Sequence, residues 1–287
     1  MVRGFRRTGV LVAGACALAA TAVVAQTVEI PLACPDLSPG PARAVARAID
    51  GETLGLDDGT ELRLIGALAP RAIDAGAEVG TWPAEAKTRE ALGALVLGKS
   101  IELGFGGERT DRYGRLQAHA FLVEADRRRW VQGLLLEQGL ARAYTLAGNR
   151  ACGAEVLAAE RTARQARRGL WADAAYQIRA PDRASELLRH RTTFQIVEGR
   201  IVRVAQVRGV IYLNFDRDWR QGFAVSLRRD DRNLLGDYAG NPTGLEGRSV
   251  RVRGWIEQRG RSAIIDLSFA GQIEVVGGAD GQHDQVR

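Results

Sequence analysis

Hydrophobic residues in the first half of the chain fall into short alternating runs, separated by turn residues such as Asp57-Asp58-Gly59. A period of two is typical of strands. Longer stretches repeat their apolar residues at helical spacing, and Pro83 and Gly98 bound the first of them. We expect strands at residues 43–49, 53–56, 61–65, 101–105 and 116–123, and helices at 83–98, 130–138 and 155–168. Such an arrangement predicts a small barrel with helices packed outside.

A second set of strand patterns runs from Phe194 to Val276, with hairpin turns at Arg208-Gly209 and Arg259-Gly260. Five or six strands with one helical connection suit a five-stranded OB-type barrel. Residues 174–193 lack this alternation and are expected to connect the two domains. Residues 278–287 form a polar tail. The second barrel therefore spans residues 194–277, after a first domain at residues 43–173.

The N-terminus has the pattern of an export signal. A basic start precedes the uncharged apolar run Val10–Val24, and Val23-Val24-Ala25 fits the small-x-small rule for signal cleavage. We expect a signal peptide at residues 1–25, an N-terminal extension at residues 26–42 and a periplasmic or secreted protein. The alternative is an uncleaved anchor, although the run is shorter than the roughly 20 residues of a spanning helix.

Cysteine usage agrees with export. The chain has three cysteines, and Cys16 lies in the expected signal, which leaves Cys34 and Cys152 as a pair in an oxidising compartment. A disulfide between them would stabilise the fold by roughly 4–5 kcal/mol through loop closure. The alternative is two unrelated thiols.

The net charge is +6 and the isoelectric point is about 9.7, which favours polyanionic partners such as nucleic acid. Nearly all of the positive charge is arginine, because Lys87 and Lys99 are the only lysines. Arginine can hold phosphate with two parallel hydrogen bonds. The sequence therefore favours a phosphate-containing polymer over a neutral ligand.

Several segments of residues 43–173 resemble the staphylococcal nuclease (thermonuclease-like) family in order and spacing. They are Ile49-Asp50-Gly51-Glu52-Thr53, the run Arg63 to Arg71, Thr110-Asp111-Arg112-Tyr113-Gly114-Arg115, Gly139-Leu140-Ala141 and Gly169-Leu170-Trp171. The resemblance implies a fold class that is mainly β with α: a nuclease-type OB barrel with three helices, here followed by a second OB-like β-barrel. It also implies phosphodiester hydrolysis assisted by one Ca²⁺.

The resemblance carries over to the phosphate-facing residues of the family site. It implies that Arg63 and Arg115 stabilise the phosphate, and that Tyr113 and Tyr144 help to hold it. At the family's first metal aspartate stands Glu52, which remains an oxygen ligand for the cation.

The same comparison places residues without acceptor oxygens at two acidic positions. Leu68 stands at the second metal aspartate, and Arg71 stands at the glutamate that orients water. This set predicts a site that keeps its cations and binds Ca²⁺ poorly. The alternative is a rearranged metal site that recruits Asp74 and Glu78.

Aromatic residues of the second barrel suggest either core packing or a platform for single-stranded bases. Trp219, between Asp218 and Arg220 in a polar loop, is the best candidate for an exposed stacking ring. The leading hypothesis is an exported nuclease-like protein that binds nucleic acid or another phosphorylated polymer, with the family's catalytic acids largely lost. The alternatives are an active metal-dependent phosphodiesterase and an envelope scaffold that binds protein.

Overall fold

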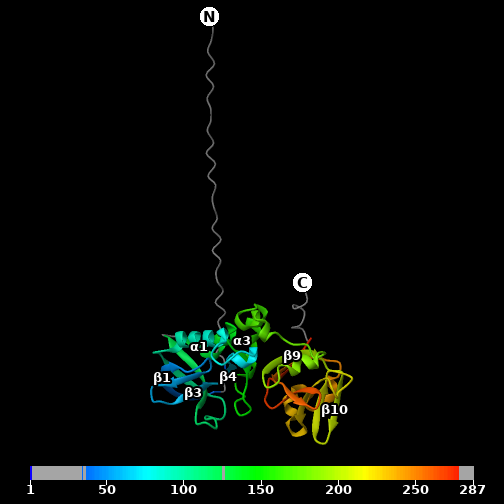
Figure 1. Ribbon diagram of the computed structural model, residues 1–287. Helices are drawn as coiled ribbons and strands as arrows, with labels where there is room; N and C mark the ends of the chain where they lie inside the picture. Colours follow the sequence, from blue (N-terminus) through cyan, green and yellow to red (C-terminus); the bar gives the residue numbers. More distant parts are fainter. Residues whose placement is uncertain (2–33, 35–36, 125–126, 278–287) are drawn as a thin grey trace. The chain divides into compact units, whose positions relative to one another are not determined.

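The computed structural model describes residues 1, 34, 37–124 and 127–277, and contacts group Ala33–Arg287 into one compact unit (Figure 1). The expected signal peptide and the polar tail lie outside the described residues. Among the described residues, no helix is long and apolar enough to cross a membrane.

The first domain is a closed five-stranded barrel, as predicted. Its strands are β1 (Ser38–Ala48), β2 (Thr53–Leu56), β3 (Glu61–Leu64), β5 (Ser100–Phe105) and β6 (Leu116–Glu124). They follow the order β3-β2-β1-β5-β6, and parallel pairing of β3 with β6 closes the ring. The alternate residues that gave the sequence its period of two fill the barrel with side chains such as Leu54, Leu62 and Leu103.

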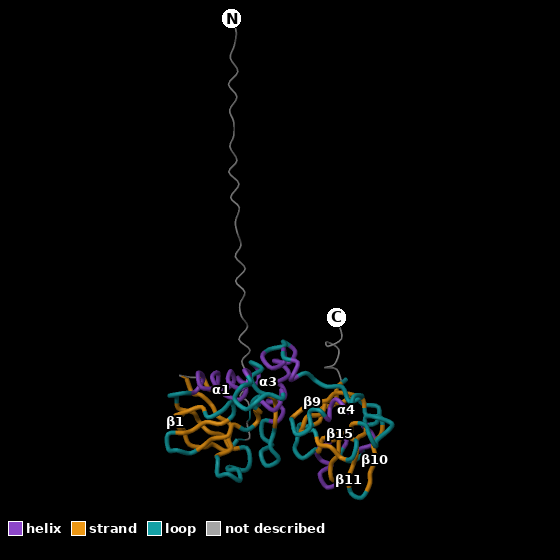
Figure 2. Tube along the Cα trace, viewed as in Figure 1, coloured by secondary structure: helices purple, strands orange, loops and turns teal. Residues whose placement is uncertain are grey.

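Helices α1 (Pro83–Val96), α2 (Val131–Glu137) and α3 (Gly153–Gln165) accompany this barrel, and α1 and α3 lie along one side of its strands (Figure 2). Pro83 occupies the first turn of α1, where its missing N–H costs no hydrogen bond. Two short strands, β4 (Gly66–Leu68) and β8 (Arg142–Tyr144), pair with each other beside the barrel.

After the connector helix α4 (Ala184–Leu188), the chain forms a second β domain with its own core. One sheet has the order β10-β11-β12-β15-β14, and the other has the order β16-β13-β9. The strands are β9 (Phe194–Arg200), β10 (Arg203–Val207), β11 (Val210–Asn214), β12 (Phe223–Arg228), β13 (Ser249–Trp255), β14 (Glu257–Arg259), β15 (Ser262–Asp266) and β16 (Ile273–Val276).

Two features of the strands do not follow from the residue pattern. The residues from Val197 to Val207 belong to two strands, β9 and β10, which are separated at Ile201-Val202 and pair in different sheets. Strand β7 (Arg127–Trp130), which pairs with β6, was not predicted, since its three consecutive arginines hide the strand pattern.

The predicted disulfide between Cys34 and Cys152 is confirmed. Their Cα atoms are 4.9 Å apart, and the bond joins positions 118 residues apart in sequence. It ties the segment before β1 to the start of α3. A disulfide is compatible with export.

Candidate phosphate-binding site

The carboxylate of Glu52 lies at the turn between β1 and β2 and is almost fully buried. Asp50 fixes the turn, because its Oδ1 accepts the Glu52 N–H at 2.7 Å. One Glu52 oxygen, Oε2, accepts the backbone N–H of Ala69 at 2.9 Å. The other, Oε1, accepts Arg71 Nη2 at 2.8 Å and lies 3.5 Å from Arg63 Nη2. Glu52 therefore serves as the shared counterion of two arginines.

Arg71 is held over this carboxylate by its own loop. Its side chain is 49% exposed, so the guanidinium is open to solvent while it contacts Glu52. Burial opposes its charge, but Glu52, with Asp74 and Asp50, outweighs that effect and raises the pKa of Arg71. A guanidinium that is charged and partly exposed in this way can bind phosphate.

The carboxylate of Asp74 is occupied by hydrogen bonds within the fold. Its Oδ2 accepts the Arg71 backbone N–H at 3.1 Å and pairs with the buried Arg142 Nη2 at 2.6 Å. Glu78, the other acid that the sequence suggested as a substitute ligand, is exposed in the following loop. Neither carboxylate joins Glu52 in a ligand cluster among the described residues.

Leu68 lies at the end of β4 and is 2% exposed. It packs into an aromatic cluster with Phe194 and Phe269 of the second β domain, beside Tyr144 and Trp255. We call this set the junction cluster. The position at which the resemblance implies a metal ligand is therefore an apolar contact between the two domains.

The strand register places Arg63 beside the start of β6. Arg63 lies opposite Thr53 on β2 and opposite Gln117 on β6. Arg115 directly precedes β6 and stands two residues before Gln117. The two arginines that the sequence singled out therefore come from neighbouring segments of the barrel.

Arg115 is paired within its own loop. Its Nη2 lies 2.7 Å from Asp111 Oδ2. Burial opposes ionisation of Asp111, but hydrogen bonds from Arg115 and from the backbone hold the pKa of that carboxyl below its usual value. Tyr113 is 67% exposed, and its ring lies 5.4 Å from the Arg115 guanidinium carbon. The loop thus presents a cation beside an open ring.

The donor set does not fit the Ca²⁺ site that the resemblance implied. A calcium site needs about six oxygen ligands, with carboxylates among them. Of the three acidic positions that the resemblance implies, the one at Glu52 keeps an acid, and two guanidinium groups lie against it. Leu68 offers no oxygen, and Arg71 adds a positive charge.

A comparison with known protein families identifies the family to which the barrel domain is similar. Residues 61–173 match the family described as Staphylococcal nuclease homologue. The chain contains a staphylococcal nuclease-like domain. No curated protein matches the chain. The family is typically Ca²⁺-dependent. The match to it supports nucleic-acid binding and a nuclease-like function only in general terms.

The matched residues begin at β3, although β1 and β2 complete the barrel of the nuclease-like domain. Glu52 thus lies just outside the matched residues, whereas Arg63, Leu68, Arg71, Arg115 and Tyr144 lie within them.

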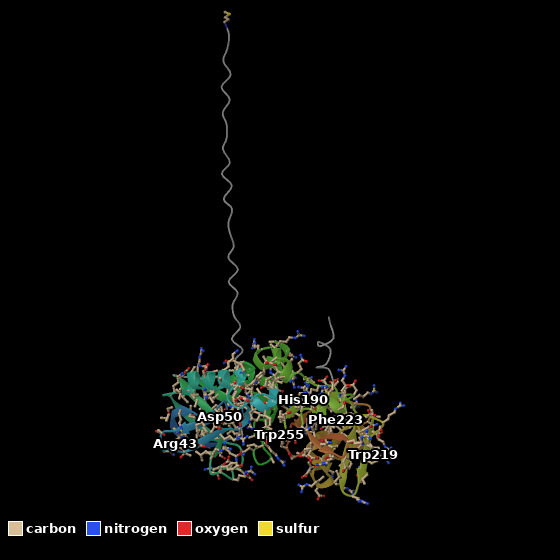
Figure 3. All side chains as sticks on the ribbon, viewed as in Figure 1. Arg43, Asp50, His190, Trp219, Phe223 and Trp255 are labelled. Atoms are coloured by element: carbon tan, nitrogen blue, oxygen red, sulfur yellow. A yellow bond between two sulfur atoms is a disulfide. The ribbon has the colours of Figure 1, made fainter. Side chains whose placement is uncertain are left out.

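Trp219 is 58% exposed, and the Arg220 guanidinium lies 4.6 Å from the centre of its ring. Figure 3 shows Trp219 and Trp255 in separate parts of the second β domain. Phe215 and Phe223, two other aromatic residues of the second β domain, are buried in its core. Stacking of bases on Trp219 stays a prediction.

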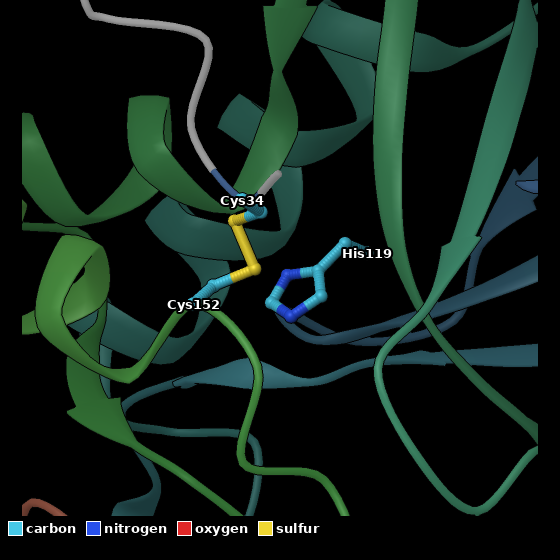
Figure 4. A group of neighbouring side chains, drawn as sticks. All are labelled: Cys34, His119 and Cys152. Atoms are coloured by element: carbon cyan, nitrogen blue, oxygen red, sulfur yellow. A yellow bond between two sulfur atoms is a disulfide. The ribbon is translucent and has the colours of Figure 1, made fainter. Parts of the chain in front are cut away.

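One further group of potential metal ligands comes together in the nuclease-like domain. The ligand atoms of Cys34, His119 and Cys152 lie within 4.8 Å of one another, and all three residues are buried (Figure 4). The two sulfur atoms are bonded to each other, so they offer no thiolate to a cation. We assign this group a structural role.

Sequence reasoning missed two buried arginines that join the domains. Arg142 donates to the Phe194 carbonyl at 2.6 Å, and Arg253 donates to Glu160 Oε2 at 2.7 Å. Their partners lie 52 and 93 residues away in sequence. No local pattern marks such residues, because charged side chains are ordinarily expected at the surface.

Proposed function

We propose that this protein is an exported, nuclease-like binder of nucleic acid or another phosphorylated polymer, and that it hydrolyses phosphodiesters little or not at all by the family mechanism. The observation that carries the proposal is the shared carboxylate: Glu52 pairs with both Arg63 and Arg71. The site keeps an excess of positive charge, which attracts phosphate.

The same charges disfavour a divalent cation. Two like charges 4 Å apart repel by about 4 kcal/mol at an effective dielectric constant of 20, so Arg71 opposes the ion that its family counterpart would support. Arg71 also carries no acceptor that could orient a water molecule. Neither a metal-bound water nor a general base is supplied at these positions.

Phosphate binding is tested by fluorescence anisotropy of a labelled 15-nucleotide single strand over a range of salt concentrations. We expect Arg63→Ala with Arg115→Ala to weaken binding and to reduce the salt dependence, by roughly 0.7 in slope for each phosphate that the variant no longer neutralises. Arg228→Ala is the matched control, because Arg228 also pairs with an aspartate, Asp231, but lies in the second β domain.

Hydrolysis is tested by plasmid nicking with Ca²⁺, Mg²⁺ or Mn²⁺ and with a chelator. We expect no cleavage that the chelator suppresses. Robust chelator-sensitive cleavage that Arg63→Ala abolishes would overturn the proposal in favour of a phosphodiesterase with a rearranged metal site. Absence of salt-dependent binding to any polyanion would favour the protein-binding scaffold.

Export is part of the proposal and rests on the basic start, the apolar run and the disulfide. N-terminal sequencing of protein from the periplasm or medium should begin at Gln26. Protein that remains in the cytoplasm with both thiols free would contradict it.

A further inference from the structure

The junction cluster is only partly closed. The ring of Tyr144 meets three rings of the second β domain, those of Trp255 at 5.1 Å, Phe194 at 5.7 Å and Phe269 at 4.9 Å between centroids. Phe194 and Phe269 are buried, whereas Tyr144 and Trp255 each keep part of their surface exposed. One aromatic residue from each domain is thus only partly buried at the junction.

Tyr144 brings this cluster next to β4, the strand that Arg63 and Arg71 flank in the sequence. Strand β8 carries Tyr144 opposite Gly66 of β4, in the segment that continues to Arg71. Burial raises the pKa of the Tyr144 hydroxyl, while the charges of Arg63 and Arg71 lower it and that of Glu52 raises it further. Tyr144 therefore touches Trp255 with its ring and lies in the field of both arginines.

Buried charges hold the two domains in register at this place. Arg142, next but one to Tyr144, binds Asp74 with one nitrogen and the Phe194 carbonyl with the other. On β13, Arg253 precedes Trp255 by two residues and pairs with Glu160 of α3. The ring of Trp255 is consequently fixed relative to Arg63 and Arg71 before any ligand arrives, which lowers the entropic cost of binding.

We propose that the domain junction is a composite subsite for one nucleotide of a single-stranded nucleic acid. Arg71 and Arg63 bind the phosphate, and the exposed surfaces of Trp255 and Tyr144 receive the unpaired base. This inference rests on the proposed function of the arginine site. It adds that the second β domain contributes directly to recognition and that the ligand is single-stranded.

The reasons for a base, and for a single strand, are chemical. An inorganic polyanion would use the arginines but would gain nothing from aromatic rings. Bases offer an aromatic face for stacking, worth roughly 1–3 kcal/mol for each base. A duplex keeps those faces stacked inside the helix, so a ring at the edge of a phosphate site discriminates in favour of unpaired bases.

The test uses the full chain and three probes: a labelled 15-residue oligothymidylate, a duplex of equal length and inorganic polyphosphate. We expect the wild-type protein to bind the single strand most tightly. Trp255→Leu should weaken single-strand binding by about tenfold with an unchanged salt slope, because phosphate contacts remain. Polyphosphate binding should not change.

Phe269→Leu is the matched control, because Phe269 belongs to the same cluster but is buried at 3% exposure. It should keep the wild-type affinity for the single strand. A second readout does not depend on folding of a variant: 5-iododeoxyuridine in the oligonucleotide should photocrosslink to Trp255 or Tyr144, as mapped by mass spectrometry.

The outcomes separate the two proposals. Equal losses in Trp255→Leu and Phe269→Leu, or strong salt-dependent binding without crosslinks at either ring, would overturn the composite subsite and leave the arginine site standing. No salt-dependent binding of any of the three probes would overturn the proposed function itself.

Discussion

Leu68 shows how one residue can change both chemistry and architecture. Its side chain fills a buried position between the two domains, where an aspartate would have to lose its hydration against Phe194 and Phe269. At the position where the resemblance implies an acidic metal ligand, this chain supplies an apolar contact between its domains. The proposed lack of a metal ligand and the domain contact thus concern a single position.

Restoring the aspartate should therefore be costly. We expect Leu68→Asp to lower the free energy of unfolding by about 3 kcal/mol or more, because it buries a carboxylate and removes an apolar side chain. Urea unfolding at pH 7 measures the change, with Leu68→Met as the volume-conserving control. A decrease smaller than about 1 kcal/mol would show that the junction admits water at this position.

His119 makes stability depend on pH. It is 1% exposed on β6, where its Nδ1 accepts the Trp130 indole N–H at 3.2 Å. Burial lowers its pKa from 6.5 to about 4. The folded state holds the neutral imidazole, whereas the unfolded state takes up a proton below pH 6.5. Its contribution is fully present above pH 6.5 and is lost as the pH falls towards 4.

This difference in pKa corresponds to about 3 kcal/mol between pH 6.5 and pH 4. Other groups also titrate in this range, so the comparison is made with His119→Gln, which keeps an acceptor for Trp130 but does not titrate. We expect the loss of stability between pH 7 and pH 4 to be smaller in the variant. Equal losses in the two proteins would mean that His119 is accessible to protons when folded.

At the scale of elements, the long alternating runs were predictable and the short pairings were not. Strands β5 and β6 and helix α1 follow from the period of their own apolar residues. Strand β8 has only three residues and contains a buried arginine, Arg142, which is stable there because Asp74, 68 residues away, supplies the opposite charge. A local pattern carries no information about such a partner.

The candidate site divides in the same way. The positions of Arg63 and Arg115 were expected from the order of the motifs, and the pairing of β3 with β6 brings their segments together. The pairing of Glu52 with Arg71 depends on the path of the loop after β4, and the covering of Leu68 depends on how a domain 126 residues later docks. Distant contacts of this kind appear only in the folded chain.

The pair between β13 and α3 should be the strongest polar link between the domains. Arg253 and Glu160 are both almost fully buried, and Arg253 also binds Glu274. Removing one partner of a buried pair typically costs about 3–5 kcal/mol, so we expect a decrease in stability of this size in Arg253→Leu.

The matched control for that variant is Arg251→Leu on the same strand. Arg251 pairs with Glu198, which is 35% exposed, so the variant should be less stable by about 1 kcal/mol at most. Chemical denaturation of both variants measures the difference. Similar decreases in stability for the two variants would indicate that Arg253 contributes through the packing of β13 and not through its ion pair with Glu160 of α3.

At the scale of the whole molecule, the disulfide closes a long loop around the nuclease-like domain. Joining positions 118 residues apart stabilises the fold by about 5 kcal/mol in the chain-entropy model. We expect Cys34→Ser with Cys152→Ser to lower the thermal midpoint by roughly 10–20 °C, at about 2–4 °C for each kcal/mol. A thiol reductant should lower the midpoint of the wild-type protein and leave that of the double variant unchanged. A reductant effect on the double variant would point to another cause.

The two domains should unfold together, although each has its own core. The second β domain buries Leu187, Val197 and Val250 internally, which supports independent folding. Its Phe194 and Arg253, however, are buried against the nuclease-like domain, so separation would expose an aromatic ring and would take from Arg253 its buried partner Glu160. Unfolding of either domain therefore loses the favourable free energy of the contacts between them. We expect a single unfolding transition for the full chain in urea.

A fragment that begins at Arg183 keeps α4 and the whole second core, and we expect it to unfold cooperatively at a lower urea concentration than the full chain. A fragment that begins at Thr192 lacks Leu187 of that core and should be less stable still. Circular dichroism and tryptophan fluorescence follow both fragments. If the longer fragment melts without cooperativity, the second β domain depends on the nuclease-like domain for its core. If its unfolding midpoint in urea equals that of the full chain, the junction contributes nothing to stability.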